Sequence, residues 1–431
     1  FWVGSWYNGV SRVDLGSGGF SRMARAPGDV GALADKKVRA VADAGNGKLW
    51  LATKGGLKLY DTRDGSSRLF DLRSSPGMSR DEQVTTLYKA PDGTLWVGGS
   101  TGLHRFDPVL GRFFTMRFAA GDPNSDTIRN IVSDRSGMLW VSTRGGVHRF
   151  DPASRRFTTY RHDPADPNSL SDNMVRPVLE DGKGQLWIGS FHGLDLLDRA
   201  SGHFRHFRHD PQDPHSLSHD EVHFLHEDKR GVLWVGTANG LNRMDVDAKG
   251  EIRFRRFLRK DGMADDAIAS ILGDDNEQLW LSTNSGITRL DMRSGLFRNY
   301  DSADGTVEGS YFDGAALRAS DGTMYFGGFN GMTAFAPQDI HDNRVPPLVA
   351  ITELQIFNKP VAVGRGEFAQ VLKAAIDHTR QLVLTSRESV FSLEFAALHF
   401  AAPQRNMFAY RLEGFDQDWV MTDAGRRFAT Y

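Results

Sequence analysis

Four basic residues stand at matching positions of a repeated sequence, and their side chains could together bind an anion. Each follows the first apolar residue of a short apolar run; they are Arg39, Arg129, Arg176 and His223. A guanidinium group binds carboxylate or phosphate oxygens through two parallel hydrogen bonds, and an imidazole adds a donor that titrates near neutral pH. This set therefore suits an anionic ligand such as an acidic sugar.

A second set of candidate binding residues lies in short turns whose composition changes from repeat to repeat. These residues are Arg144, Phe191, His192, Phe329 and Asn330, and the equivalent turns elsewhere hold Trp6–Asn8, Lys54 and Ala238–Asn239. Variable loops on a rigid scaffold are where recognition is usually built, and aromatic rings stack on sugars. We predict that both sets lie on one face, at the mouth of a central channel. The alternative is that each arginine pairs with an aspartate of its neighbour and is structural.

The sequence offers no pattern for catalysis or for metal binding. Paired carboxylates, a Ser/His/Asp set, a glycine-rich phosphate loop and a metal cluster are all missing from it. Aspartates recur instead at one turn position of successive repeats, which favours a turn role: Asp61, Asp107, Asp151, Asp198, Asp245 and Asp291. Two similar loops, His162–Ser171 and His209–Ser218, begin with His-Asp-Pro, and we interpret them as rigid turns rather than metal sites. We expect no catalytic residue, metal or cofactor in this segment.

These residues are positioned by a sequence repeat of 44 to 48 residues, marked by an aromatic residue at Trp2, Trp50, Trp96, Trp140, Trp187, Trp234, Trp280 and Tyr325. Each unit holds four short apolar runs separated by Gly, Asp, Asn or Ser turns, which indicates antiparallel strands in hairpins. Four strands in a unit of this length are typical of a β-propeller blade, because a lone sheet needs neighbours to cover both faces. The tryptophans are expected to fill the space between blades.

The repeats predict an all-β chain with a seven-bladed β-propeller over residues 36–340, because seven first strands can be counted. Residues 1–35 hold a copy without a first strand, which is either the tail of a preceding propeller or a set of strands that closes this ring. Residues 341–431 lack the repeat, and Ser389–Phe395 alternates in the manner of a half-buried strand. We predict a linker there, followed by an incomplete β-sandwich.

Composition excludes several classes of partner. The chain has 52 Lys and Arg residues against 54 Asp and Glu residues, so it has no basic field for nucleic acid or for an anionic membrane. The absence of cysteine excludes disulfides and thiolate chemistry. No apolar run reaches about 18 residues, so the sequence contains no membrane span.

Two motifs resemble known families. The repeated Asp-x-x-Gly-x-Leu-Trp pattern, as in Asp134–Asp151, resembles the two-component regulator propeller repeat. The segments Phe391–Leu398 and Tyr410–Trp419 resemble the start of a Y-Y-Y domain, an immunoglobulin-like module. The order of the two motifs is specific, and together they cover nearly the whole chain.

This resemblance implies the periplasmic ligand-sensing part of an inner-membrane receptor. In such proteins a membrane span follows the sandwich, and a histidine kinase of a phosphorelay or a diguanylate cyclase forms the output. The implied partners are a small molecule or an oligosaccharide, and a second copy bound through the sandwich. The alternatives are a propeller enzyme, such as a lyase or glycosidase, and a protein-interaction scaffold.

Overall fold

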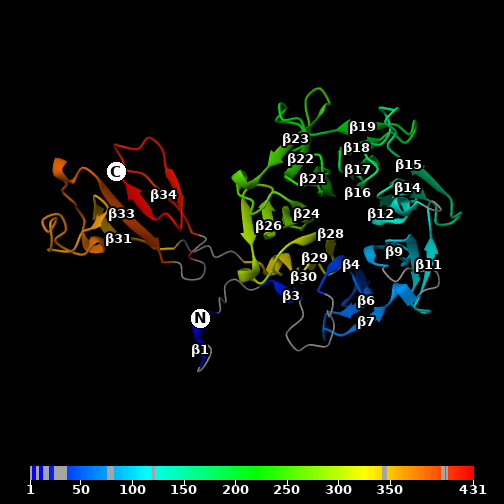
Figure 1. Ribbon diagram of the computed structural model, residues 1–431, viewed down its shortest axis with the longest axis horizontal. Coiled ribbons are helices and arrows are strands. Elements are labelled where there is room, and N and C mark those ends of the chain that lie inside the picture. The colour runs from blue at the N-terminus through cyan, green and yellow to red at the C-terminus, as the bar shows by residue number, and fades with distance from the viewer. Residues whose placement is uncertain are drawn as a thin grey trace. The chain divides into compact units, whose positions relative to one another are not determined.

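The computed structural model describes residues 2–5, 9–12, 19–23, 36–74, 82–118, 122–341, 347–398, 403 and 406–431 (Figure 1). Within them the regular structure is almost entirely strand, so the predicted all-β class is confirmed. The exceptions are one short helix, α1 (Pro123–Asp126), and the 3-10 turns η1 (Leu72–Ser74), η2 (Arg259–Asp261), η3 (Ser302–Asp304), η4 (Pro337–Asp339), η5 (Ile376–His378) and η6 (Ser386–Glu388). The chain divides into two compact units, Gly18–His341 and Phe1–Ser17 with Asp342–Tyr431.

The described part of the larger unit contains seven four-stranded antiparallel sheets, which we number as blades in chain order. The first strand of each sheet contacts the first strand of the next, and the last of these contacts the first, so the ring is closed as in a propeller. The strands of blades 1 to 3 are β4–β7 (Val38–Gly45, Lys48–Thr53, Gly56–Asp61, Ser67–Phe70), β8–β11 (Val84–Lys89, Leu95–Gly99, Leu103–Asp107, Arg112–Met116) and β12–β15 (Ile128–Ser133, Leu139–Thr143, Gly146–Phe150, Phe157–Tyr160).

Blades 4 to 6 follow the same order of strands along the chain. They are β16–β19 (Val175–Glu180, Leu186–Ser190, Gly193–Leu197, Phe204–Phe207), β20–β23 (Val222–Glu227, Leu233–Thr237, Gly240–Val246, Ile252–Phe257) and β24–β27 (Ile268–Gly273, Gln278–Thr283, Gly286–Asp291, Phe297–Tyr300). Blade 7 combines β28 (Tyr311–Arg318), β29 (Met324–Gly328) and β30 (Gly331–Phe335) with β3 (Ser21–Met23) from the start of the chain.

The core lies between blades, as the repeated tryptophans predict. Trp140 of blade 3 packs in one cluster with Val178, Ile188 and Phe204 of blade 4, and Trp96 of blade 2 packs with Ile131 and other residues of blade 3. Burying such side chains contributes about 1.5–3 kcal/mol each relative to leaving them exposed. The faces that a single sheet would expose to water are thus covered by its neighbours.

A buried aspartate fixes each tryptophan of blades 3 to 6. In blade 3 the Asp134 carboxylate accepts hydrogen bonds from Trp140 Nε1 at 2.9 Å and from the amides of Ser136 and Met138. The same Asp-to-Trp bond occurs in the next three blades, at 2.9, 2.9 and 3.1 Å from Asp181, Asp228 and Asp274. One carboxylate therefore closes the turn between the first two strands and satisfies the indole N–H.

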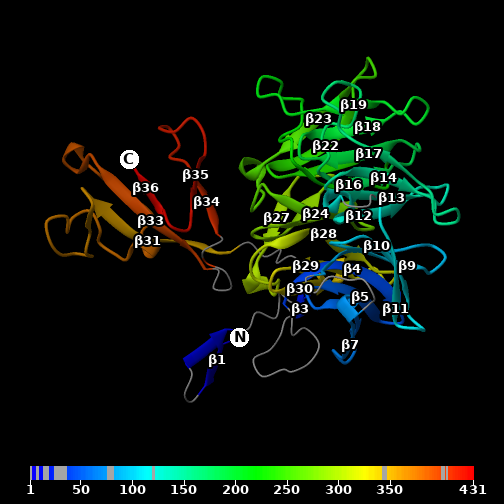
Figure 2. The ribbon, with the colours of Figure 1, turned by 45° about the vertical axis from the view of Figure 1, so that its right-hand side comes forward.

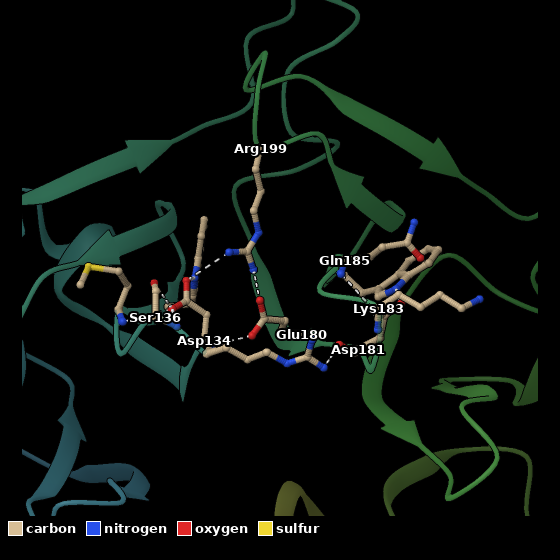
Figure 3. Close-up of polar contacts among 11 residues, drawn as sticks. Asp134, Ser136, Glu180, Asp181, Lys183, Gln185 and Arg199 are labelled. Carbon is tan, nitrogen blue, oxygen red and sulfur yellow. Dashed lines mark hydrogen bonds and ion pairs between the residues drawn. The ribbon is translucent and has the colours of Figure 1, made fainter.

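The same aspartate also connects neighbouring blades. Arg199 of blade 4 reaches Asp134 at 3.3 Å and Glu180 at 2.6 Å, and Figure 3 shows its guanidinium between the two carboxylates. Although burial opposes ionisation of Asp134, the hydrogen bonds from Ser136 and Trp140 hold its pKa below the usual value. The charged form of this carboxylate is thus the one that the blade stabilises.

We predict that Asp134→Ala lowers the free energy of unfolding by about 2–4 kcal/mol, because Trp140 Nε1 loses its buried acceptor. The matched variant Asp151→Ala removes a more exposed turn aspartate of the same blade, and we expect a much smaller loss of stability from it. Urea unfolding monitored by tryptophan fluorescence measures both. Equal losses would contradict a special role for Asp134.

The copy of the repeat at the N-terminus is divided between two places. Its strands β1 (Trp2–Ser5) and β2 (Gly9–Arg12) pair with each other, whereas β3 pairs with β30 and lies beside it in both ribbon views (Figure 2). Arg22 donates to the carbonyls of Thr306 and Ser302 at 3.0 and 2.7 Å, and Phe20 lies against Phe335 with ring centroids 4.7 Å apart. Of the two interpretations of residues 1–35, the ring-closing strand applies to Ser21–Met23.

We predict that deleting residues 1–23 lowers the melting temperature and promotes self-association, because β30 becomes an unpaired sheet edge. Deleting residues 1–17 leaves β3 in place and serves as the control. Thermal unfolding and size-exclusion chromatography of the two truncations report the difference. If both behave alike, β3 does not stabilise the ring.

The second unit has its own sheets. One contains β31 (Val349–Ile356), β32 (Lys359–Pro360), β33 (Phe391–Ala397) and β36 (Phe428–Thr430), and the other pairs β34 (Met407–Tyr410) with β35 (Val420–Asp423). Ser392 of β33 is buried, and its hydroxyl is satisfied by a hydrogen bond with that of Thr430 at 2.8 Å. The described part of the chain holds no helix of the length and hydropathy that a bilayer crossing requires.

Candidate ligand-binding site

The predicted binding residues on the first strands lie in β-bulges. The pairing of β4 with β5 shifts between Val38 and Ala40, which leaves Arg39 outside the ladder. The pairings of the equivalent strands shift in the same way at Arg129 and His223, and a longer irregularity in β16 contains Arg176. A bulge bends the strand and re-aims the extra residue, so these four basic residues occupy equivalent irregularities of their blades.

The structure brings four of the predicted arginines into one electrostatic cluster. Burial and the positive charges of Arg144, Arg176 and Arg39 together lower the pKa of Arg129 to about 10, against the opposing effect of Asp313. Arg144 reaches this cluster from the turn between β13 and β14, whereas the other three come from first strands. Arg144 of the turn set thus lies within electrostatic range of Arg129 of the first-strand set.

Carboxylates neutralise only one side of this cluster. Arg176 pairs with Glu221 of the next blade at 3.1 Å and with Asp313 of blade 7 at 2.7 Å. His223 lies near the same two acids, 3.2 Å from Glu221 and 3.5 Å from Asp313. For Arg176 the structural alternative, pairing with an acid of another blade, is thus observed.

The remaining arginines have no carboxylate at ion-pair distance among the residues that the structure describes; they are Arg39, Arg129 and Arg144. Arg39 Nε is fully buried without a hydrogen-bond partner in the described part of the chain. Unsatisfied buried donors and adjacent like charges both cost free energy. The positive charges of these three side chains are therefore not neutralised by an ion pair with a described carboxylate.

Aromatic rings lie beside the arginines. The guanidinium of Arg176 sits 4.4 Å from the ring centroid of Phe191, and that of Arg39 sits 5.2 Å from the ring of Phe312. Phe312 stacks on Phe329 with centroids 4.0 Å apart, and Phe329 is 41% exposed. Two of the arginines thus lie against aromatic rings, and the neighbouring ring of Phe329 is accessible to solvent.

Two predicted residues make local contacts within their own loops. His192 Nδ1 lies 2.5 Å from Asp172, and Asn330 donates to the carbonyl of Glu308 at 3.0 Å. Neither contacts the arginine cluster in any interaction that the structure describes. The turn at Trp6–Asn8 lies outside the described residues.

Sequence reasoning missed Glu221, Phe312 and Asp313. The first strand of blade 7 begins at Tyr311, ahead of the apolar run Ala315–Leu317, and its pairing with β29 is interrupted between Tyr311 and Ala316. Phe312 and Asp313 therefore follow the first residue of the strand, as Arg39 and Arg129 do. Aligning Tyr311 with the apolar residue that starts the other first strands would have found them.

The two His-Asp-Pro loops are held by hydrogen bonds, as expected for structural turns. In blade 4 His206 bonds Asp195 through Nδ1 at 2.6 Å and the Pro167 carbonyl through Nε2 at 2.9 Å. In blade 5 Arg256 donates to the carbonyls of Ser216 and Asp213 at 2.8 and 2.6 Å. Among the described residues, no group of three His, Asp or Glu side chains is arranged to hold a metal ion.

We predict that the loop of blade 4 loosens as pH rises, whereas that of blade 5 does not. The hydrogen bond to Asp195 raises the pKa of His206 above 6.5, so its stabilisation is present below that pH and is lost as pH rises through the raised value. His206→Gln should thus lower the melting temperature more at about pH 5.5 than at about pH 8.5. Arg256→Gln is the control and should lower the melting temperature equally at both pH values. If His206→Gln also lowers the melting temperature equally at both, the charge of His206 does not stabilise the loop.

Comparison with known proteins agrees with this architecture. The family model described as two component regulator propeller matches residues 216–239, which span the first two strands of blade 5. A histidine kinase of Formosa agariphila is 32% identical over 174 residues, which are 40% of this chain and 13% of that protein. The chain therefore spans a small part of that relative.

Solved structures share the fold. The extracellular domain of a proposed hybrid two component system from B. thetaiotaomicron superposes with a TM-score of 0.73 and 24% identity, over 100% of this chain and 55% of that one. Virginiamycin B lyase from Staphylococcus aureus superposes with a TM-score of 0.52 and 16% identity, over 71% of this chain and 97% of that one. The chain thus carries the two component regulator propeller repeat on the fold of the extracellular domains of hybrid two-component systems.

Proposed function

We propose that this chain is the extracytoplasmic sensing region of a transmembrane two-component receptor, and that a small or oligosaccharide-like ligand binds at the mouth of the propeller channel. The observation that carries the proposal is the group of arginines without acidic partners, next to an exposed aromatic ring. Residues of several blades contribute to it, so a bound ligand would bridge parts of the ring that are far apart in the sequence.

The comparisons support the sensor function at the level of the fold and of the repeat. We propose a periplasmic location for this chain, and a membrane span and a histidine kinase or diguanylate cyclase output in the full-length protein. We also propose that residues 341–431 form an incomplete immunoglobulin-like sandwich, and that two copies of the protein dimerise through it. A coding sequence that lacks an apolar segment of about 20 residues downstream would contradict the span. The rival function, a lyase, has support only from a shared fold, which does not imply shared chemistry.

A binding screen tests the sensor function on the purified chain. We expect a saccharide or another small ligand from a chemically diverse panel to bind saturably and to be recovered unchanged. Phe329→Ala should weaken this binding about tenfold, because the ligand loses its stacking contact with the exposed ring. Calorimetry measures the affinity, and chromatography of the ligand detects turnover.

The matched control is Phe114→Ala, because Phe114 is 43% exposed on β11, an outer strand of blade 2, against 41% for Phe329. Binding should survive this change. Conversion of the ligand would favour the lyase. Loss of binding in both variants, or in neither, would place the ligand away from the mouth.

A further inference from the structure

We infer that the mouth recognises its ligand through an oxyanion, a carboxylate or a sulfate, held by Arg39, Arg129 and Arg144. This inference deepens the proposed function and rests on the same site. It names the chemical group that is bound and the part of the mouth that binds it.

The bulge position itself does not require arginine for folding. In blade 2 the same position holds Thr85, whose hydroxyl donates toward the carbonyls of Gly98 and Ile128, at 3.0 and 2.8 Å. In blade 6 it holds Ala269, a buried residue with no polar side-chain atom. Threonine and alanine occupy the bulge position in equivalent blades. The ring therefore folds without arginine there, and the arginines have a role other than folding.

The positions of the arginines are also energetically unfavourable in the absence of a ligand. Arg129 is partly buried among three other guanidinium groups, and Arg39 Nε is buried without a hydrogen-bond acceptor in the described part of the chain. An oxyanion supplies the negative charge that this cluster lacks. Two of its oxygens match the fork of donors on a guanidinium group.

Charge is unevenly distributed around the mouth, and this determines on which side the anionic group of the ligand binds. Glu221 and Asp313 already occupy Arg176 and lie beside His223, so that side is neutralised and repels a further anion. The uncompensated charge belongs to blades 1 and 3. Arg39 also lies against the Phe312 ring, which stacks on exposed Phe329, so a sugar ring carrying the anion finds an aromatic face next to the arginines.

The site can be tested with inorganic sulfate as the probe, before any natural ligand is identified. Sulfate added at constant ionic strength should raise the melting temperature of the whole chain saturably, relative to chloride. Arg129→Gln should weaken the apparent sulfate affinity about tenfold or more, because a charge-assisted contact is lost. Arg149→Gln is the matched control, since Arg149 is an exposed arginine on β14 of the same blade.

Two further variants keep the test decisive. Arg144 is exposed on a turn, so Arg144→Gln should fold and still weaken sulfate binding even if Arg129→Gln does not fold. Glu221→Gln removes a competing negative charge and should tighten sulfate binding severalfold. Equal sulfate affinity in wild type, Arg129→Gln and Arg144→Gln would overturn the inference.

A second arm separates the sources of the oxyanion and separates this inference from the proposed function. Trigalacturonate that binds more tightly than sulfate, with a loss in Arg129→Gln, supports a sugar carboxylate. Sulfate binding with the same loss, and no binding by saccharides, supports a free oxyanion and removes the saccharide part of the proposed function. A neutral trisaccharide that binds at the mouth equally well in wild type and Arg129→Gln overturns the inference and leaves the sensor function standing.

Discussion

The hydrogen bond between a buried tryptophan and a buried aspartate is the constraint on which blades 3 to 6 depend. The carboxylate sits in the turn between two strands, and the indole lies between two sheets, so this bond couples the shape of one blade to its packing on the next. In blades 1 and 2 the aspartate is replaced by Ala44 and Ala90. Their tryptophans keep 8% and 5% exposure, against 0 to 3% for the four that have the bond.

The order of strands was predictable because every blade uses the same physical solution. The period of the aromatic residue and the turn residues between apolar runs indicate the strands of blades 1 to 6, and constant spacing placed Arg39, Arg129 and His223 at equivalent positions. Blade 7 was harder to predict, because Tyr325 replaces tryptophan and the pairing of β28 is interrupted over several residues. The place of β3 in that blade could not be predicted from the local sequence, since β3 gains its partner strand only when the ring closes.

The candidate site was predictable in its residue types but not in its charge balance. Spacing indicates which residues occupy equivalent positions of the first strands, whereas the pairing of Arg176 with Asp313 joins blade 4 to blade 7 and depends on the diameter of the ring. The bulge explains why this position tolerates different types of residue. A residue outside the ladder contributes little to strand pairing, so arginine, threonine, alanine and phenylalanine can all stand there without altering the sheet.

Closure of the ring by β3 also has a kinetic consequence. The contact between Arg22 and Thr306 spans 284 residues, and contacts of such high sequence separation slow folding because the chain between them must be ordered first. During synthesis β3 emerges before its partner β30, so it has to wait until the last blade is complete. Arg39 and Phe312 come within 5.2 Å only when blades 1 and 7 meet. The proposed binding site therefore forms only once the first and last blades have closed the ring.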